Sequence, residues 1–135
     1  MDRTMGVRCG IDIVDISRFE KIVKDANVSF IRKCFTEDEI SYCESSKNPE
    51  KKAERYAARF AAKEAVGKAL GTGLLSEGVG MHDIEVYKDE RGTPGIRLTG
   101  GALRHAEELG VNSISISLSH DGGIAGAYCV MLSEK

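Results

Sequence analysis

One alanine-rich segment near the middle of this 135-residue chain constrains the fold most. Asn48-Pro49 is a strong helix start, and Gly71 directly follows Leu70 as a helix stop. The alanines between them let other backbones pack closely against the segment. We therefore expect one long helix over residues 49–70.

Shorter elements surround this helix in the sequence. Residues 7–14 predict a strand, and Asp15 or Ser17 can cap a helix that runs to about residue 25. Thr36-Glu-Asp-Glu39 is a capping-box pattern, which predicts a helix to about residue 44. Further on we expect hairpins over 83–99 and 113–132, and short helices over 29–34 and 102–109. The order predicts a single α+β domain over residues 1–135, in which a small antiparallel-rich sheet packs against one long and several short helices.

The overall composition excludes several classes of protein. A formal net charge of −2 argues against a nucleic-acid partner. The chain has no apolar run of about 18 residues, so we expect no membrane helix. The N-terminal residues lack the apolar core of a signal peptide, and the four cysteines form no C-x-x-C pair. These features predict a cytoplasmic protein with reduced thiols, without a disulfide or a zinc site.

Basic residues are nevertheless concentrated between positions 18 and 33. Five of them stand against two acidic residues, Glu20 and Asp25. This local surplus could attract an acidic macromolecule although the whole chain is slightly acidic. The basic residues are Arg18, Lys21, Lys24, Arg32 and Lys33.

Two carboxylates stand in unusual surroundings. Asp12 lies within the apolar strand, where a carboxylate is costly to bury unless it is paired or holds a cation. It therefore indicates either a salt bridge or a ligand of Mg²⁺. Glu64 follows Phe60 by four positions on the long helix, at the edge of its apolar side. It could simply pair with Lys68 one turn later, or serve as a second metal ligand.

Several groups suited to anions accompany these carboxylates. Arg59 and Lys63 continue a ridge of cations on the long helix, which is either a solvated face or an anion-binding surface. Gly71-Thr72-Gly73 is either a helix stop with a flexible loop or a phosphate-binding turn, and it is neither a Walker A sequence nor a Rossmann fingerprint. His120 ends a predicted strand, where it either bonds locally within the turn or binds phosphate.

Taken together, the motifs resemble those of holo-[acyl-carrier-protein] synthase, the short bacterial type of 4′-phosphopantetheinyl transferase. The resemblance covers about residues 6 to 132, and the motifs stand in the order of the family. The motifs are Gly10-Ile-Asp-Ile-Val-Asp-Ile-Ser-Arg18, Phe35-Thr-Glu-Asp-Glu39, Arg59-Phe-Ala-Ala-Lys-Glu-Ala65, Lys68-Ala-Leu-Gly-Thr-Gly73, Asp83-Ile-Glu-Val86 and Ser117-Leu-Ser-His-Asp121.

The resemblance implies a fold, a reaction and roles for residues. The family transfers the phosphopantetheine arm of coenzyme A to a serine of apo acyl carrier protein, with adenosine 3′,5′-bisphosphate as the other product. Mg²⁺ on the pyrophosphate would be held by Asp12 and Glu64. Lys68 and His120 would lie near the phosphates, and Arg18 would face the acidic carrier protein. Members of this short type are homotrimers with active sites between subunits, and they serve fatty acid biosynthesis.

From this resemblance we expect catalysis to consist mostly of positioning and charge neutralisation. Arg59 and Lys63 would strengthen the anion-binding field, and residues 71–73 would admit the nucleotide. The serine proton could pass to Glu64 or to a metal-bound water, and the sequence does not choose between them. An Mg²⁺-dependent phosphohydrolase and a non-enzymatic module that binds an acidic partner remain the alternative functions.

Overall fold

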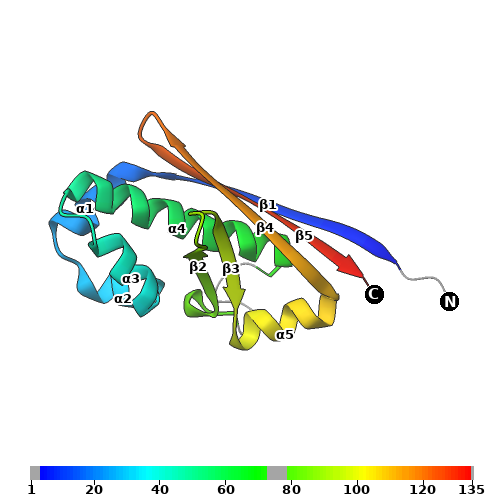
Figure 1. The fold of residues 1–135 in the computed structure, drawn as a ribbon. Helices are drawn as coiled ribbons and strands as arrows, with labels where there is room; N and C mark the ends of the chain where they lie inside the picture. The colour runs from blue at the N-terminus through cyan, green and yellow to red at the C-terminus, as the bar shows by residue number, and fades with distance from the viewer. Residues whose placement is uncertain (1–3, 73–78, 135) are drawn as a thin grey trace.

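The elements of the computed structural model follow the predicted order, and the structure describes residues 4–72 and 79–134. An N-terminal strand leads into helices, and strands dominate the C-terminal half (Figure 1). The elements are β1 (Met5–Asp15), α1 (Ile16–Lys24), α2 (Val28–Cys34), α3 (Glu37–Glu44), α4 (Pro49–Leu70), the 3₁₀ turn η1 (Met81–Asp83), β2 (Ile84–Lys88), β3 (Pro94–Leu98), α5 (Gly100–Leu109), β4 (Val111–Asp121) and β5 (Ile124–Glu134).

The long helix α4 begins and ends where the sequence predicts. The Asn48 side chain accepts hydrogen bonds from the backbone N–H groups of Glu50 and Lys51 at 2.9 and 3.3 Å, which caps the start of the helix. Gly71 ends it in the left-handed conformation, with φ of 79°. This backbone strains other residue types, so the glycine serves as a genuine stop.

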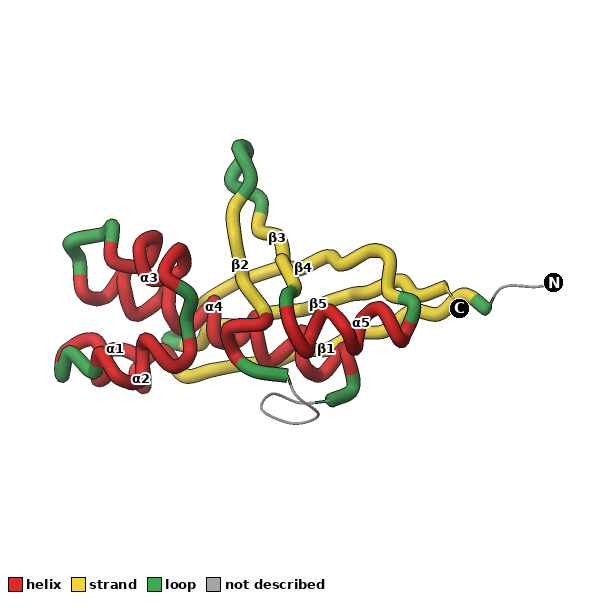
Figure 2. Tube along the Cα trace, turned by 90° about the horizontal axis from the view of Figure 1, so that it is seen from below, coloured by secondary structure: helices red, strands yellow, loops and turns green. Residues whose placement is uncertain are grey.

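Helix α4 packs against one face of a three-stranded antiparallel sheet. The strand order is β1-β5-β4, so the first and last strands of the chain pair along their full length. Figure 2 shows α4 and α5 lying across this sheet in the view from below. Alanines of both layers, such as Ala65 and Ala127, are buried between them, which allows close contact.

The hairpin β2–β3 forms a separate two-stranded sheet. The sequence predicts the hairpin, but the expected single small sheet is divided into two in the structure. Ile84 and Val86 point from β2 into the core. The hairpin thus lies against the side of α4, and its backbone can form hydrogen bonds with side chains of that helix.

The helices α1 to α3 enclose an aromatic cluster at the N-terminal part of α4. Phe19 lies 5.4 Å from Phe60 and 6.4 Å from Phe35, measured between ring centroids. The capping box of α3 is present as predicted, because Thr36 and Glu39 exchange their backbone and side-chain hydrogen bonds. Asp15 stands at the N-cap of α1, yet its side chain makes no capping bond.

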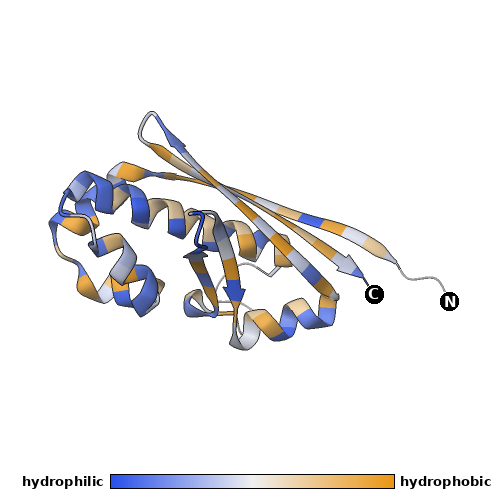
Figure 3. Cartoon of the chain, in the orientation of Figure 1, coloured by the Kyte–Doolittle hydropathy of each residue, from blue (hydrophilic) through white to orange (hydrophobic). Residues whose placement is uncertain are grey.

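The other face of the three-stranded sheet is exposed, and its β1 and β5 part is apolar. Along β1, Val7, Ile11 and Ile13 are 72, 61 and 68% exposed, and Tyr128 and Leu132 of β5 are 47 and 41% exposed. Pairing of Val7 with Leu132 and of Ile11 with Tyr128 gathers these side chains on one surface. Figure 3 shows hydrophobic residues recurring along these strands. None of the helices in the described ranges has both the length and the hydropathy needed to cross a membrane.

Candidate active site

The site begins with a close approach of β1 to α4. A Cβ atom at Gly10 would lie 2.1 Å from the Ala65 carbonyl oxygen and 2.8 Å from the Ala69 nitrogen. Real Cβ atoms do not tolerate such contacts, so residue 10 must be glycine for the strand to lie this close to the helix. Asp12 stands two positions later on the same face of β1, and it is therefore brought against the same helix.

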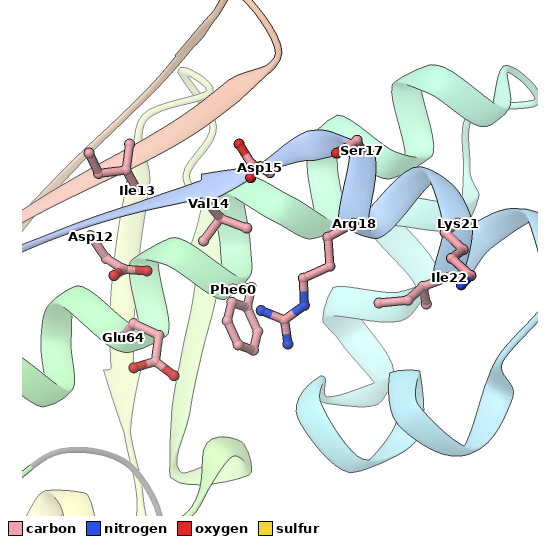
Figure 4. A pocket seen from close by; sticks show the side chains of 10 residues that line it. All are labelled: Asp12, Ile13, Val14, Asp15, Ser17, Arg18, Lys21, Ile22, Phe60 and Glu64. Atoms are coloured by element: carbon pink, nitrogen blue, oxygen red, sulfur yellow. The ribbon is translucent and has the colours of Figure 1, made fainter.

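Asp12 meets two charged residues of α4 at this crossing. The Lys68 ammonium lies 3.2 Å from Asp12 Oδ1 and donates a second hydrogen bond to the Ile11 carbonyl oxygen at 2.9 Å. Figure 4 shows the Asp12 and Glu64 carboxylates beside each other, one from β1 and one from α4. The structure thus contains the predicted salt bridge of Asp12 and also brings together the two predicted metal ligands.

The electrostatics of the two carboxylates differ from those of an ordinary ion pair. Partial burial raises the pKa of Glu64, and the negative charge of Asp12 raises it further, whereas Lys68 and Arg18 act in the opposite direction. The repulsion between Asp12 and Glu64 is therefore only partly relieved by the protein itself. A cation bound between them would stabilise both ionised forms.

An open pocket of about 960 Å³ lies in front of these carboxylates. Arg18 and Lys21 of α1 line it together with Phe60, so the pocket has both charged and apolar walls. The Arg18 guanidinium lies 5.0 Å from the centre of the Phe60 ring and 5.6 Å from that of Phe19. These aromatic contacts hold the positively charged Arg18 side chain at the rim of the pocket.

The donor set fits Mg²⁺ better than a transition metal. Within residues 4–72 and 79–134, no group of three or more His, Cys, Asp or Glu side chains is arranged to hold a metal ion. Mg²⁺ keeps several waters and commonly takes one or two carboxylates plus phosphate oxygens from a substrate. Asp12 and Glu64 meet that requirement, because they leave most of the coordination sphere to a ligand.

Lys63 does not belong to this site, which corrects the prediction that it contributes to anion binding. Its side chain is fully buried, and its ammonium lies 2.7 Å from Glu39 Oε1. The same group donates hydrogen bonds to the carbonyl oxygens of Met81 and Ile84 at 3.0 and 2.5 Å. Its three N–H groups are therefore used inside the protein, and its charge is neutralised by Glu39.

Arg59 is also buried, but it lines a second pocket. It is 3% exposed, and its guanidinium lies 4.0 Å from the centre of the Tyr42 ring. Its Nε atom has no hydrogen-bond partner within the described part of the chain. A buried donor without a partner is costly, which makes Arg59 suited to receive an anion.

His120 lines this second pocket together with Arg59, so two of the predicted phosphate ligands lie in one pocket. The pocket measures about 400 Å³, and its wall holds three further cations: Lys51, Arg55 and Lys88. His120 is exposed and lies 3.9 Å from Glu54, which is also part of the lining. The predicted phosphate ligands are thus divided within one chain: Lys68 lies beside the carboxylates, and Arg59 and His120 lie in a separate basic pocket.

The loop predicted to admit the nucleotide is described in part. Gly71 and Thr72 follow α4 directly, and Gly73 lies outside the described residues. Arg8 of β1 donates a hydrogen bond from Nε to the Ala69 carbonyl oxygen at 2.7 Å, and a Cβ at Gly71 would lie 2.9 Å from its guanidinium. Arg8 thus places an additional positive charge beside the loop, a contact that its position in the strand did not indicate.

The basic residues predicted to meet a partner occupy one end of the molecule. Arg18, Lys21, Lys24 and Arg32 are all exposed, on α1 and α2. Arg18 and Lys21 lie on the pocket, whereas Arg32 is further away and its backbone carbonyl contacts His82 at 2.6 Å. The basic surface therefore begins at the carboxylates and extends outward over α2.

Sequence reasoning missed two residues that shape the site. Glu39 was recognised as a helix cap, but nothing in the sequence indicated that it also pairs with Lys63, 24 positions away. Tyr42 carried no signal, yet Arg55, Arg59 and Lys88 surround its ring. Burial acts to raise the Tyr42 pKa, but these cations outweigh it and lower the pKa.

Comparison with known proteins identifies relatives over nearly the whole chain. A model of the 4′-phosphopantetheinyl transferase superfamily matches residues 8–129. A holo-[acyl-carrier-protein] synthase of Geobacter sulfurreducens is 45% identical over 123 residues, which is 90% of this chain and 94% of the relative.

Solved structures agree with the sequence relatives. The Helicobacter pylori holo-[acyl-carrier-protein] synthase in complex with coenzyme A superimposes with a TM-score of 0.76 at 33% identity, over 91% of this chain and 98% of that one. An acyl carrier protein synthase of Plasmodium yoelii with ADP bound gives a TM-score of 0.82 at 32% identity, over 98% of this chain and 99% of that one. The chain therefore belongs to the 4′-phosphopantetheinyl transferase superfamily, within its holo-[acyl-carrier-protein] synthase family, and is a transferase of that kind.

Proposed function

We propose that this chain transfers the 4′-phosphopantetheine arm of coenzyme A to a serine of apo acyl carrier protein. Adenosine 3′,5′-bisphosphate is the second product, and the reaction depends on Mg²⁺. The observation that carries the proposal is the meeting of Asp12, Glu64 and Lys68 at the β1–α4 crossing, in a pocket rimmed by Arg18. Relatives with the same fold are named for this activity or contain coenzyme A.

The carboxylates would hold the metal, and the cations would act on the phosphates. Asp12 and Glu64 supply two oxygen ligands for Mg²⁺, which when bound neutralises pyrophosphate charge and the charge that develops during transfer. Lys68 adds a mobile positive charge beside Asp12. In this proposal Lys68 would stabilise the departing bisphosphate and give it a proton.

The chemistry exchanges one phosphorus–oxygen bond for another. The serine oxygen of the carrier protein forms a bond to the phosphorus that carries the pantetheine arm. The bond from that phosphorus to the bridging oxygen breaks, and the electron pair leaves with adenosine 3′,5′-bisphosphate. The serine proton passes to Glu64 or to water.

The second pocket supports binding of the remaining phosphate of coenzyme A. Arg59 offers a buried N–H without a partner, and His120 and Arg55 stand in the same lining. Gly71 and Thr72 would lie on the nucleotide side of Lys68. The proposed ligand therefore needs both basic regions, although a single chain keeps them apart.

Assembly into a homotrimer would bring the two regions together. The outer face of the β1–β5 pair exposes Val7, Ile11 and Tyr128, an apolar surface of the kind that protein interfaces cover. We expect active sites between subunits, in which one chain contributes the carboxylates and a neighbour contributes the basic pocket. Light scattering should find a trimer, and an Ile11→Glu, Tyr128→Glu double variant should give monomers without transfer activity.

The carrier protein would approach over α1 and α2. Arg18, Lys21, Lys24 and Arg32 form the exposed basic surface next to the pocket. Attraction between exposed charges is screened over about 8 Å at physiological salt, so this surface acts at short range. We propose that the reaction takes place in the cytoplasm and serves fatty acid biosynthesis, as the composition and the resemblance to the family imply.

Incubation with coenzyme A, Mg²⁺ and apo carrier protein tests the proposal. The expected result is a mass gain equal to the phosphopantetheine arm on the carrier serine, with one bisphosphate released for each arm transferred. A carrier variant in which this serine is alanine serves as the control. Release of nucleotide without labelling would instead identify a phosphohydrolase, and metal-independent binding without turnover would identify a binding module.

A further inference from the structure

The capping residue of α3 makes more contacts than a cap requires. Glu39 is 1% exposed, and its Oε1 atom accepts hydrogen bonds from the Thr36 backbone N–H and the Lys63 ammonium at 2.9 and 2.7 Å. Its Oε2 atom accepts another from the Val86 backbone N–H at 2.9 Å. One side chain therefore ties α3, α4 and β2 together inside the core.

Lys63 extends this connection to the turn that precedes β2. Its bonds to the Met81 and Ile84 carbonyl oxygens fix both sides of the turn η1, directly before the hairpin. On another side of α4, Gly10 holds β1 against Ala65 and Ala69. Polar bonds on one side and close packing on another therefore fix the position of α4 within the same two turns.

These contacts immediately precede the proposed metal ligand in the sequence. We propose that Glu39 is a positioning residue for the transfer reaction: through Lys63 it fixes the rotation of α4 about its axis and so holds Glu64 toward Asp12. The inference rests on the proposed function and extends it to a residue outside the pocket. Successive residues of a helix point about 100° apart, so Lys63 can be anchored in the core while Glu64 faces the pocket.

The geometry makes a small rotation consequential. A carboxylate carried about 5 Å from the helix axis moves by about 1 Å when the helix turns by about 10°. A displacement of that size at reacting groups can cost about a hundredfold in rate. Residues that orient metal ligands from behind typically contribute about 10- to 100-fold to metal affinity.

Mn²⁺ binding tests the inference without relying on turnover. Mn²⁺ serves as a spectroscopic probe for the Mg²⁺ site, and its affinity is measured by electron paramagnetic resonance on the complete protein with coenzyme A bound. Lys63→Met is expected to weaken Mn²⁺ binding about tenfold while coenzyme A affinity without metal changes less than about twofold. Circular dichroism first establishes a temperature at which each variant is folded, and Mn²⁺ binding is measured at that temperature. If Lys63→Met does not fold, the milder Glu39→Gln decides, with the same expected direction.

Tyr56→Phe is the matched control. The Tyr56 hydroxyl donates a hydrogen bond to Glu44 at 2.6 Å, so it also joins α4 to α3, but two turns before Glu64. We expect its Mn²⁺ affinity to equal that of the wild type. Unchanged affinity in folded Lys63→Met or Glu39→Gln would overturn the inference, and so would an equal loss in Tyr56→Phe. A wild-type protein that fails to label carrier protein would reject the proposed function instead, and the Mn²⁺ comparison would still decide the positioning role.

Discussion

Two charged pairs on adjacent residues of α4 have opposite designs. Lys63 and Glu39 carry opposite charges, are fully buried and satisfy each other with additional backbone bonds. Glu64 and Asp12 carry like charges, face an open pocket and are only partly compensated by Lys68. The first pair is complete without a ligand, whereas a bound cation would stabilise the second.

The difference shows how a helix can serve the core and a site at the same turn. A closed pair fixes the position of the helix, because breaking it leaves a buried charge without a partner. In an open pair, like charges repel each other, and a bound metal would relieve that repulsion. If this view is correct, damage to the closed pair should lower stability together with metal affinity, whereas damage to the open pair should lower activity and leave the fold intact.

The largest effect on stability is expected from Lys63→Met. The substitution leaves the Glu39 carboxylate buried beside two backbone donors but without a cation, which typically costs about 3–5 kcal/mol of unfolding free energy. Urea unfolding followed by circular dichroism measures it. The control is Lys52→Met, because Lys52 pairs with Glu44 across the same two helices at 3.0 Å but near the surface. There we expect about 1 kcal/mol or less, and equal losses in the two variants would remove the distinction between closed and exposed pairs.

Glu64→Gln should damage the chemistry while leaving the fold intact. Loss of one of two carboxylate ligands is expected to lower Mg²⁺-dependent transfer about 10²- to 10³-fold, while coenzyme A binding persists in part. Kinetics of carrier-protein labelling at saturating coenzyme A measure the loss. Glu50→Gln, an exposed glutamate in the first turn of α4, should retain normal turnover. Near-normal turnover of Glu64→Gln itself would reject the metal-ligand assignment.

Acidification should act on the open pair with opposite signs in the presence and absence of metal. The pKa of Glu64 lies above the ordinary value of 4.5, so the carboxylate gains a proton as the pH falls through that raised value. Metal binding needs the ionised form, so Mn²⁺ affinity should fall by up to about tenfold per pH unit below the folded-state pKa.

Without metal, the same protonation removes repulsion from Asp12. The free energy of unfolding should therefore increase as the pH falls from the folded-state pKa of Glu64 toward the ordinary value of 4.5. Comparing wild type with Glu64→Gln across this range isolates the effect. A metal affinity that falls equally in both proteins would assign the pH dependence to another group.

The smallest effect is expected at the rim of the open pair. Arg18→Glu should raise the KM for carrier protein about tenfold and blunt its salt dependence, because charge at an exposed surface mainly changes encounter. Lys47→Glu reverses an exposed charge between α3 and α4 and is the control. Identical salt responses of wild type and Arg18→Glu would exclude α1 as the docking surface and separate the pocket from partner binding.

Local signals in the sequence were sufficient for most elements. The bounds of α4 follow from Asn48, Pro49 and Gly71, and the start of α3 follows from its capping box, because each signal concerns bonds within a few residues. The division of the strands into two sheets could not be read in this way. It depends on which strand pairs with β1, and that partner is at the other end of the chain.

The candidate site could be predicted in part for the same reason. Asp12 was chosen because a carboxylate is out of place in an apolar strand, and Glu64 was assigned as its partner ligand through the resemblance to the family. The structure brings the two together. Lys63 was assigned to the wrong surface. Helix α4 is buried on several sides, so its spacing of charges does not reveal which one faces solvent. The partner that buries Lys63 is set by long-range packing, which local spacing does not encode.

The glycine at the β1–α4 crossing offers a rule for reading other sequences. A strand in which glycine precedes aspartate by two positions can bring that carboxylate onto a helix backbone, because both residues face the same side and the first has no side chain. An alanine at position 10 would push the strand away and carry Asp12 with it. The spacing Gly-x-Asp thus specifies a distance as well as a composition, and a search for it opposite alanine-rich helices that carry glutamate could locate similar carboxylate pairs in unrelated folds.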